Sequence, residues 1–117
     1  MAAIPTGLMA TLAVPWDCRI TEVAAYATAG TPGSIQVDIW KCAYNDYNLG
    51  PAGVVHPVDA DSITGGNEIN IVADDKYRDL TLTGWKKDLL ERDILAFYVD
   101  SCTTIERVTI ELTLVTT

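Results

Sequence analysis

The sequence is poor in the residues on which catalysis and nucleic-acid binding depend. Its one histidine, His56, lies in a loop-like stretch that contains no motif of the Gly-x-Ser-x-Gly type. Basic residues are also scarce, with 8 Lys and Arg against 16 Asp and Glu and a net charge of -8. A charge of this sign repels phosphate backbones and anionic lipid. We therefore expect a chain that is not an enzyme and binds neither nucleic acid nor a membrane.

Paired cysteines and long apolar runs are missing as well. Cys18, Cys42 and Cys102 form no Cys-x-x-Cys pair, and an odd number of thiols is not consumed by internal disulfides. Reduced thiols in a β core are the favoured interpretation, with a single bridge as the alternative. No run approaches the ~18 apolar residues of a membrane span. Residues 1–14 contain no Lys or Arg to begin a signal peptide, so we expect the protein to be made in and to stay in the cytoplasm.

Acidic residues gather in two places where calcium would be one possible ligand. The candidate clusters are Asp59 and Asp61 with Glu68, and Asp74 and Asp75 with Asp79. Hard cations take clustered carboxylate oxygens, but neither spacing matches an EF-hand loop. We interpret both clusters as solvated acidic loops and expect no metal and no other cofactor.

Alternating apolar residues are the main structural signal. Ile35, Val37 and Ile39 alternate with polar residues in the segment 34–41, and residues 107–114 repeat the pattern, which is typical of half-buried strands. Further strands are expected at 7–14, 20–28, 68–72, 79–83 and 93–100, with a helical turn or loop at 86–91. Residues 20–28 and 34–41 are expected to form a hairpin, and residues 42–66 a long surface loop, the kind of connection that often carries function.

Seven to eight short strands and no clear helical pattern predict an all-β fold, an antiparallel β-sandwich of the jelly-roll-like type. At 117 residues the chain is long enough to close one core. We expect a short N-terminal arm at residues 1–6 and a single β-sandwich domain at residues 7–117.

Aromatic residues are the candidates for an interaction site, because exposed rings anchor protein interfaces or stack on sugars. The set flanks loops or occupies the polar side of a strand, and consists of Trp16, Trp40, Tyr44, Tyr47 and Trp85. Trp40 shares a strand face with Gln36 and Asp38. Either a loop of the same chain or another chain is expected to cover it.

Four segments resemble, in order and spacing, the small β-sandwich modules of tailed-bacteriophage structural proteins. They are Gly-Ser-Ile-Gln-Val-Asp-Ile-Trp-Lys at 33–41, Leu-Thr-Gly-Trp at 82–85, Asp-Ile-Leu at 93–95 leading to Val-Asp-Ser at 99–101, and Arg-Val-Thr-Ile-Glu-Leu at 107–112. The modules commonly have Gly before the Asp of the third segment, where this chain has Arg92.

The resemblance implies a non-enzymatic virion structural protein. It implies a capsid decoration or head-fibre protein that forms a homo-oligomer, with a trimer as the expected state, and docks on the major capsid protein or another virion protein. The absence of a helical or repetitive stalk before the module favours decoration over a long fibre. The alternatives are a carbohydrate-binding module, which would use the loop aromatics on host glycans, and a tail-associated receptor-binding protein.

Overall fold

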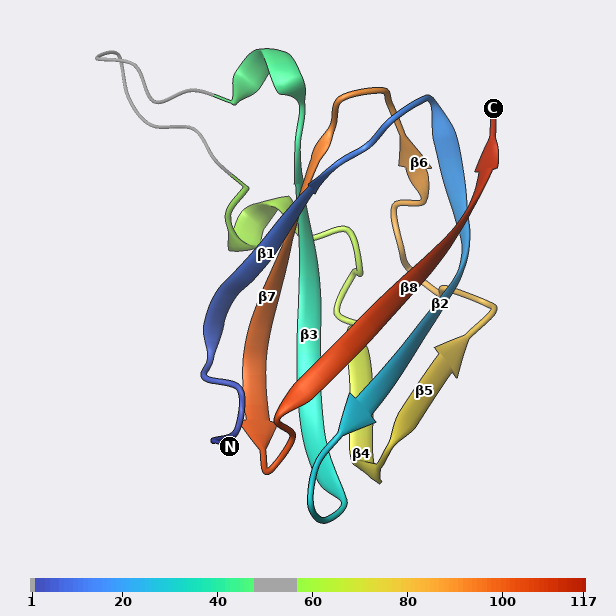
Figure 1. Cartoon of the computed structure of the whole chain (residues 1–117). Coiled ribbons are helices and arrows are strands. Elements are labelled where there is room, and N and C mark those ends of the chain that lie inside the picture. The colour runs from blue at the N-terminus through green and yellow to red at the C-terminus, as the bar shows by residue number, and fades with distance from the viewer. Residues whose placement is uncertain (1, 48–56) are drawn as a thin grey trace, which may run out of the picture.

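The computed structural model describes residues 2–47 and 57–117, and in these ranges the chain is an antiparallel β-sandwich (Figure 1). His56 lies outside the described residues. The predicted all-β class and strand number are confirmed. The strands are β1 (Gly7–Ala13), β2 (Cys18–Thr28), β3 (Gly33–Cys42), β4 (Ile69–Asp74), β5 (Lys76–Asp79), β6 (Asp88–Leu89), β7 (Ile94–Thr103) and β8 (Arg107–Thr116).

Two sheets pack face to face. Sheet A has the order β1-β7-β3-β4. In sheet B, β2 pairs with β8 on one side and with β5 and β6 on the other. The chain passes from one sheet to the other at most connections, and the two short 3-10 helices, η1 (Tyr44–Asp46) and η2 (Asp59–Asp61), lie in loops. None of the helices in the described ranges has the length and apolar character needed to cross a membrane.

The hairpin predicted from residues 20–28 and 34–41 is wrong. β2 belongs to sheet B and β3 to sheet A, where β3 pairs with β4 and β7. Both strands have one strongly apolar face, and placing them in opposite sheets buries these faces against each other. A hairpin would have set the two faces side by side in one sheet instead.

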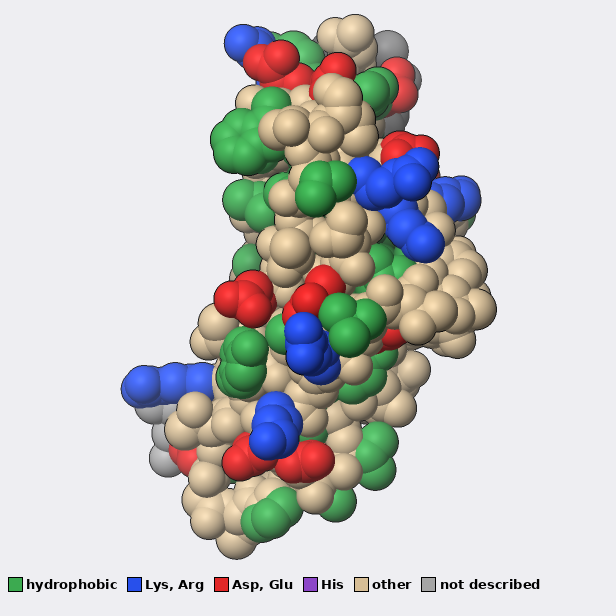
Figure 2. Space-filling view, turned by 90° about the vertical axis from the view of Figure 1, so that its right-hand side faces the viewer, with side chains coloured by type: hydrophobic (Ala, Val, Ile, Leu, Met, Phe, Trp, Pro, Cys, Tyr) green, Lys and Arg blue, Asp and Glu red, His purple; other side chains and the backbone are tan. Residues whose placement is uncertain are grey.

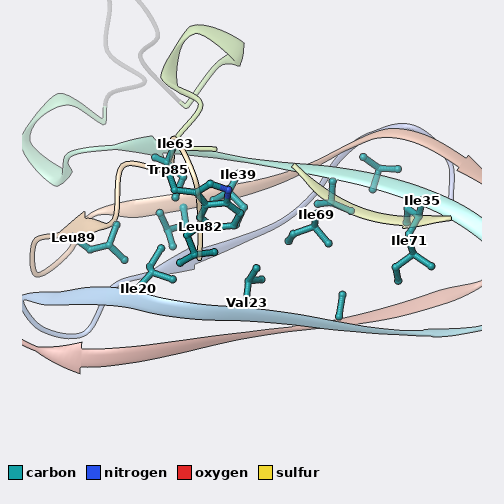
Figure 3. Close-up of a cluster of buried hydrophobic side chains, with 14 of the residues drawn as sticks. Ile20, Val23, Ile35, Ile39, Ile63, Ile69, Ile71, Leu82, Trp85 and Leu89 are labelled. Carbon is teal, nitrogen blue, oxygen red and sulfur yellow. The ribbon is translucent and has the colours of Figure 1, made fainter. Parts of the chain in front are cut away.

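The core fills the space between the sheets (Figure 3). Ile20 and Val23 of β2 face Ile35 and Ile39 of β3, and all four side chains are at most 1% exposed. Loops contribute Ile63, Leu82 and Trp85 to the same cluster. Burial of large aliphatic side chains from both sheets is the main source of stability in such a fold.

The strand predicted at residues 79–83 is also wrong, because β5 ends at Asp79, where the predicted strand would begin. The Asp79 carboxylate accepts hydrogen bonds from the backbone N–H groups of Thr81 and Leu82 at 2.9 and 3.0 Å and so folds the chain into a turn. Leu82 adopts a φ of 52°, which points its side chain into the core, while Leu80 is 60% exposed. The alternation of apolar residues here belongs to a turn. Residues 86–91, predicted as a helical turn or a loop, form a loop that contains the two-residue strand β6.

The predicted N-terminal arm lies along the domain in its described part. The Ile4 N–H donates a hydrogen bond to the Ile105 carbonyl at 2.8 Å, and the Ile4 side chain packs against the core. The neighbouring residues 2, 3, 5 and 6 are exposed.

Candidate interaction surfaces

Three of the five aromatic residues are exposed near one end of the sandwich. Trp16 lies in the β1–β2 loop, and Tyr44 and Tyr47 lie in and directly after η1. Their exposed fractions are 49%, 58% and 42%, and Leu90 in the β6–β7 turn is 63% exposed. We call these four residues, Trp16, Tyr44, Tyr47 and Leu90, the aromatic end.

The 90–93 turn holds the aromatic end together. The Arg92 N–H donates to the Val14 carbonyl at 2.7 Å, and the Glu91 N–H donates to the Asp17 carboxylate at 2.8 Å, which fixes the loop that carries Trp16. On the other side, the Arg92 guanidinium lies 5.6 Å from the centre of the Tyr44 ring. Arg92 has a φ of 69°, a backbone conformation that favours glycine. The phage modules that the sequence resembles commonly have a glycine at this position.

Trp40 is covered by its own chain, which is one of the two alternatives left open by the sequence. Its ring is 9% exposed and stacks on Tyr98, with the ring centroids 4.4 Å apart. Its indole N–H donates a hydrogen bond to Asp38 Oδ2 at 3.0 Å, and its backbone forms a β-bridge with Ser62 in the loop after η2. Trp40 therefore offers little surface to a partner.

Trp85 is likewise part of the interior. It is 6% exposed, and its indole N–H donates to the Asn67 carbonyl at 2.8 Å. The interface role predicted for the five aromatic residues stays a prediction, and burial narrows the residues able to touch a partner to Trp16, Tyr44 and Tyr47.

Three carboxylates that the sequence did not single out as a group meet on the outer face of sheet A. Asp38 of β3, Asp100 of β7 and Glu68, directly before β4, each place an oxygen within 4.8 Å of the others. Asp38 is 4% exposed, and its Oδ1 accepts hydrogen bonds from the hydroxyls of Ser62 and Thr64, both at 2.8 Å. Among the described residues this is the acidic group whose oxygens come close enough to hold one cation, and neither of the predicted loop clusters gathers.

Glu68 is the member of this carboxylate group with a raised pKa and, among the described residues, an unpaired buried oxygen. Its Oε1 is buried and has no hydrogen-bond partner in the described part of the chain. Burial, a hydrogen bond with Asp100 and the charges of Asp100, Asp38 and Asp59 raise the pKa of Glu68 to about 8. The group therefore holds a proton near neutral pH. Pairing of β4, β3 and β7 brings these residues together, so the signal available in the sequence was only that Asp38 lies on the polar side of its strand.

The open side of the sandwich exposes apolar surface. A groove of about 500 Å³ runs between the edge strand β1 of sheet A and the edge strand β8 of sheet B. Its lining is apolar apart from Thr11 and includes Met9, Leu12, Phe97, Val108 and Ile110. On β1, Leu8, Met9 and Leu12 are 51%, 45% and 47% exposed. Exposed edges with apolar side chains are common sites of association.

Basic side chains gather on another surface of this acidic chain. Arg19, Lys41, Lys86 and Lys87, four of the eight basic residues, border a hollow of about 480 Å³, and Figure 2 shows Lys and Arg side chains grouped on the face it draws. Arg19 forms a salt bridge with Asp88 at 2.9 Å, and Lys41 contacts the Asp88 carbonyl at 3.3 Å. Part of the positive charge is therefore neutralised within the chain.

The three cysteines are free thiols, and none of them forms a bridge within the chain. The interchain bridge that was part of the alternative stays a prediction. Cys18 and Cys42 are buried and Cys102 is half-buried. Burial, with the charges of nearby aspartates, raises the pKa of the Cys18 and Cys42 thiols above its ordinary value. Both thiols are thus in their less reactive form near neutral pH.

Comparisons with protein-family models, curated proteins and solved structures found no match to this chain.

Proposed function

We propose that this protein is a non-enzymatic structural protein of a tailed-bacteriophage virion, a capsid decoration or head-fibre protein that oligomerises and docks on the particle. Its partner is the major capsid protein or another virion protein, and its location is the virion. The order of the four sequence segments supports the phage context. The aromatic end supports docking and is the observation on which the proposal rests.

The aromatic end has the features of an anchor. Trp16, Tyr44 and Leu90 expose roughly half or more of their surface on a frame held by the hydrogen bonds of the 90–93 turn. Rings on a rigid frame lose little conformational entropy when a partner covers them, and aromatic side chains are enriched among residues that dominate binding. Docking through this end would leave the opposite end, where the described N-terminal residues lie, directed away from the partner (Figure 1).

Co-sedimentation with phage heads tests the docking proposal. Heads assembled from a tailed-bacteriophage major capsid protein are incubated with the protein, and bound protein is measured after a salt wash. We expect the wild type to bind, and Trp16→Ala and Tyr44→Ala each to bind about tenfold or more weakly, since truncating a central aromatic costs about 2 kcal/mol. Both variants should keep the wild-type circular dichroism spectrum, because the two rings lie largely outside the core.

Val72→Ala is the matched control, because Val72 on β4 is 64% exposed and lies outside the aromatic end. It should bind heads as the wild type does. Failure of the wild type to bind heads would contradict docking on the capsid. Equal binding by the wild type and the three variants would mean that the protein docks through a surface other than the aromatic end.

A carbohydrate-binding module is the second candidate, favoured by the Tyr44 ring with the Arg92 guanidinium beside it. A half-exposed ring stacks on the apolar face of a sugar, and a nearby cation binds acidic or hydroxyl groups. Binding of the isolated protein to immobilised bacterial glycans, lost in Tyr44→Ala and without binding to heads, would favour this candidate or a tail-associated receptor-binding protein.

A further inference from the structure

The strand β8 has one side available for pairing. It pairs with β2 over its whole length, from Arg107 opposite Thr28 to Thr116 opposite Cys18. Within residues 2–47 and 57–117, no strand pairs with its other side. The unpaired backbone N–H and C=O groups of such an edge are a template for another strand.

The chain lacks the usual protection on this edge. β8 contains no proline and no inward-pointing charge, and its inward side chains Val108, Ile110, Leu112 and Leu114 are all apolar. These side chains are only half-buried, whereas the inward residues of β2 and β3 are almost completely buried. Val108 and Ile110 also border the apolar groove. A strand added here would therefore cover apolar surface as well as satisfy backbone groups.

The outward charges of β8 are self-complementary. Arg107 and Glu111 are exposed, and among the described residues neither side chain forms a hydrogen bond or an ion pair. Arg78, across the sheet from Glu111, is already held by Glu22 through contacts of 2.8 and 3.2 Å. Two antiparallel copies of β8 centred on Thr109 would place Arg107 of each chain opposite Glu111 of the other. The same register places Val108 opposite Ile110.

We propose that two copies of this chain pair through β8, antiparallel about a two-fold axis at Thr109, and form a dimer in place of the trimer that the resemblance implies. The inference deepens the proposed function by naming the partner and the surface used in oligomerisation, and it rests on that function for its biological setting. Directly opposite residues in an antiparallel pair bring their Cβ atoms within about 5.5 Å, close enough for two symmetry-related Arg107–Glu111 salt bridges. The pairing joins the two B sheets and brings together the two apolar grooves.

A charge-exchange experiment tests the register directly. Arg107→Glu and Glu111→Arg should each weaken the dimer by about tenfold or more in Kd, because each variant replaces two attractive pairs with two repulsive ones. An equimolar mixture of the two variants should form a heterodimer, since all its opposed charges differ in sign. The double variant, Arg107→Glu with Glu111→Arg, should dimerise like the wild type. Molar masses are measured by light scattering and sedimentation over a range of concentrations.

Lys76→Glu is the control for a change of charge alone, because Lys76 is exposed on β5, on the opposite side of β2 from β8. It should leave the dimer unchanged. Circular dichroism should show that every variant folds, since the side chains of Arg107 and Glu111 make no hydrogen bond or ion pair inside the described chain.

A wild type that stays monomeric, or a mass of three chains, would overturn the inference, because a two-fold strand pair closes at two copies. Single variants that dimerise like the wild type, or a mixture and a double variant that stay monomeric, would overturn it as well. These outcomes are separate from docking: binding of a monomer to phage heads would leave the proposed function standing and remove only the β8 dimer.

Discussion

Glu68 makes the stability of the protein depend on pH between about 4.5 and 8. Its pKa of about 8 in the folded chain lies above the ordinary value of 4.5, so the folded state binds more protons than the unfolded state between these values. The contribution of Glu68 to stability is therefore fully present below about pH 4.5 and is lost as the pH rises through about 8.

Glu68→Gln should remove this dependence. The amide is uncharged at every pH, so the variant should match the wild type near pH 5 and have the higher melting temperature at pH 9. The groups whose pKa is lowered, Glu22, Asp74 and Asp88, titrate below this range. Melting temperatures at pH 5, 7 and 9 measure the effect, with Glu91→Gln as an exposed control. A wild type whose stability rises from pH 5 to 8 would contradict the assignment.

At the level of single residues, the sequence placed Asp38 and Trp40 correctly on the polar side of their strand. It could not show what covers that side. The loop that supplies Ser62 and Thr64 reaches Asp38 across more than twenty residues of chain, and the stacking partner Tyr98 comes from β7. Contacts of this kind depend on how distant segments pair. The alternation of apolar and polar residues within one segment carries no information about that pairing.

In the β2–β3 connection, the backbone of Gly33 lies close to the turn between β7 and β8. A Cβ atom added to Gly33 would lie 2.2 Å from Thr104 Oγ1 and 2.3 Å from the Thr103 carbonyl, in the turn between β7 and β8. A Cβ added to Gly30 would meet no heavy atom within 4 Å. The absence of a side chain at Gly33 lets β3 begin in close contact with the turn after β7. Gly30 lies in the same connection but makes no close contact that a side chain would disturb.

Gly33→Ala should therefore lower the free energy of unfolding by about 1–3 kcal/mol, because the backbone of the β7–β8 turn must shift to make room. Gly30→Ala should be close to neutral and serves as the control. Urea denaturation followed by circular dichroism measures both. Equal midpoints for the two variants would mean that the turn moves away at no cost.

The elements that the sequence predicted best are those whose pattern is complete in one segment. The alternating segments became β3 and β8, and the apolar run at 93–100 became β7, an inner strand of sheet A. One error arose where the backbone conformation, and not the alternation of residues, determines which way a side chain points. In the turn at Asp79, the positive φ of Leu82 directs its side chain into the core. The hairpin error arose because a glycine-rich turn indicates a change of direction without indicating which sheet the next strand joins.

The whole molecule has a closed side and an open side. β3 lies between β4 and β7 in sheet A, and its inward residue Val37 lines the inner wall of the groove but is only 1% exposed. β8 is an edge strand, and its inward residue Ile110 is half-buried beside the groove. Both residues lie in segments with the same alternating pattern. The difference in their burial therefore comes from the positions of β3 and β8 in their sheets.

The two sides should respond differently to the same charge. Val37→Asp should prevent folding, because an unpaired carboxylate enclosed in the core costs several kcal/mol against a total stability of about 5–15 kcal/mol. Ile110→Asp should fold with reduced stability, since its carboxylate can reach water through the open groove. Thr113→Asp, on the exposed side of β8, should change the free energy of unfolding by no more than about 0.5 kcal/mol. Soluble expression and thermal melting distinguish the three variants, and an Ile110→Asp protein as unfolded as Val37→Asp would mean that the open side is closed in solution.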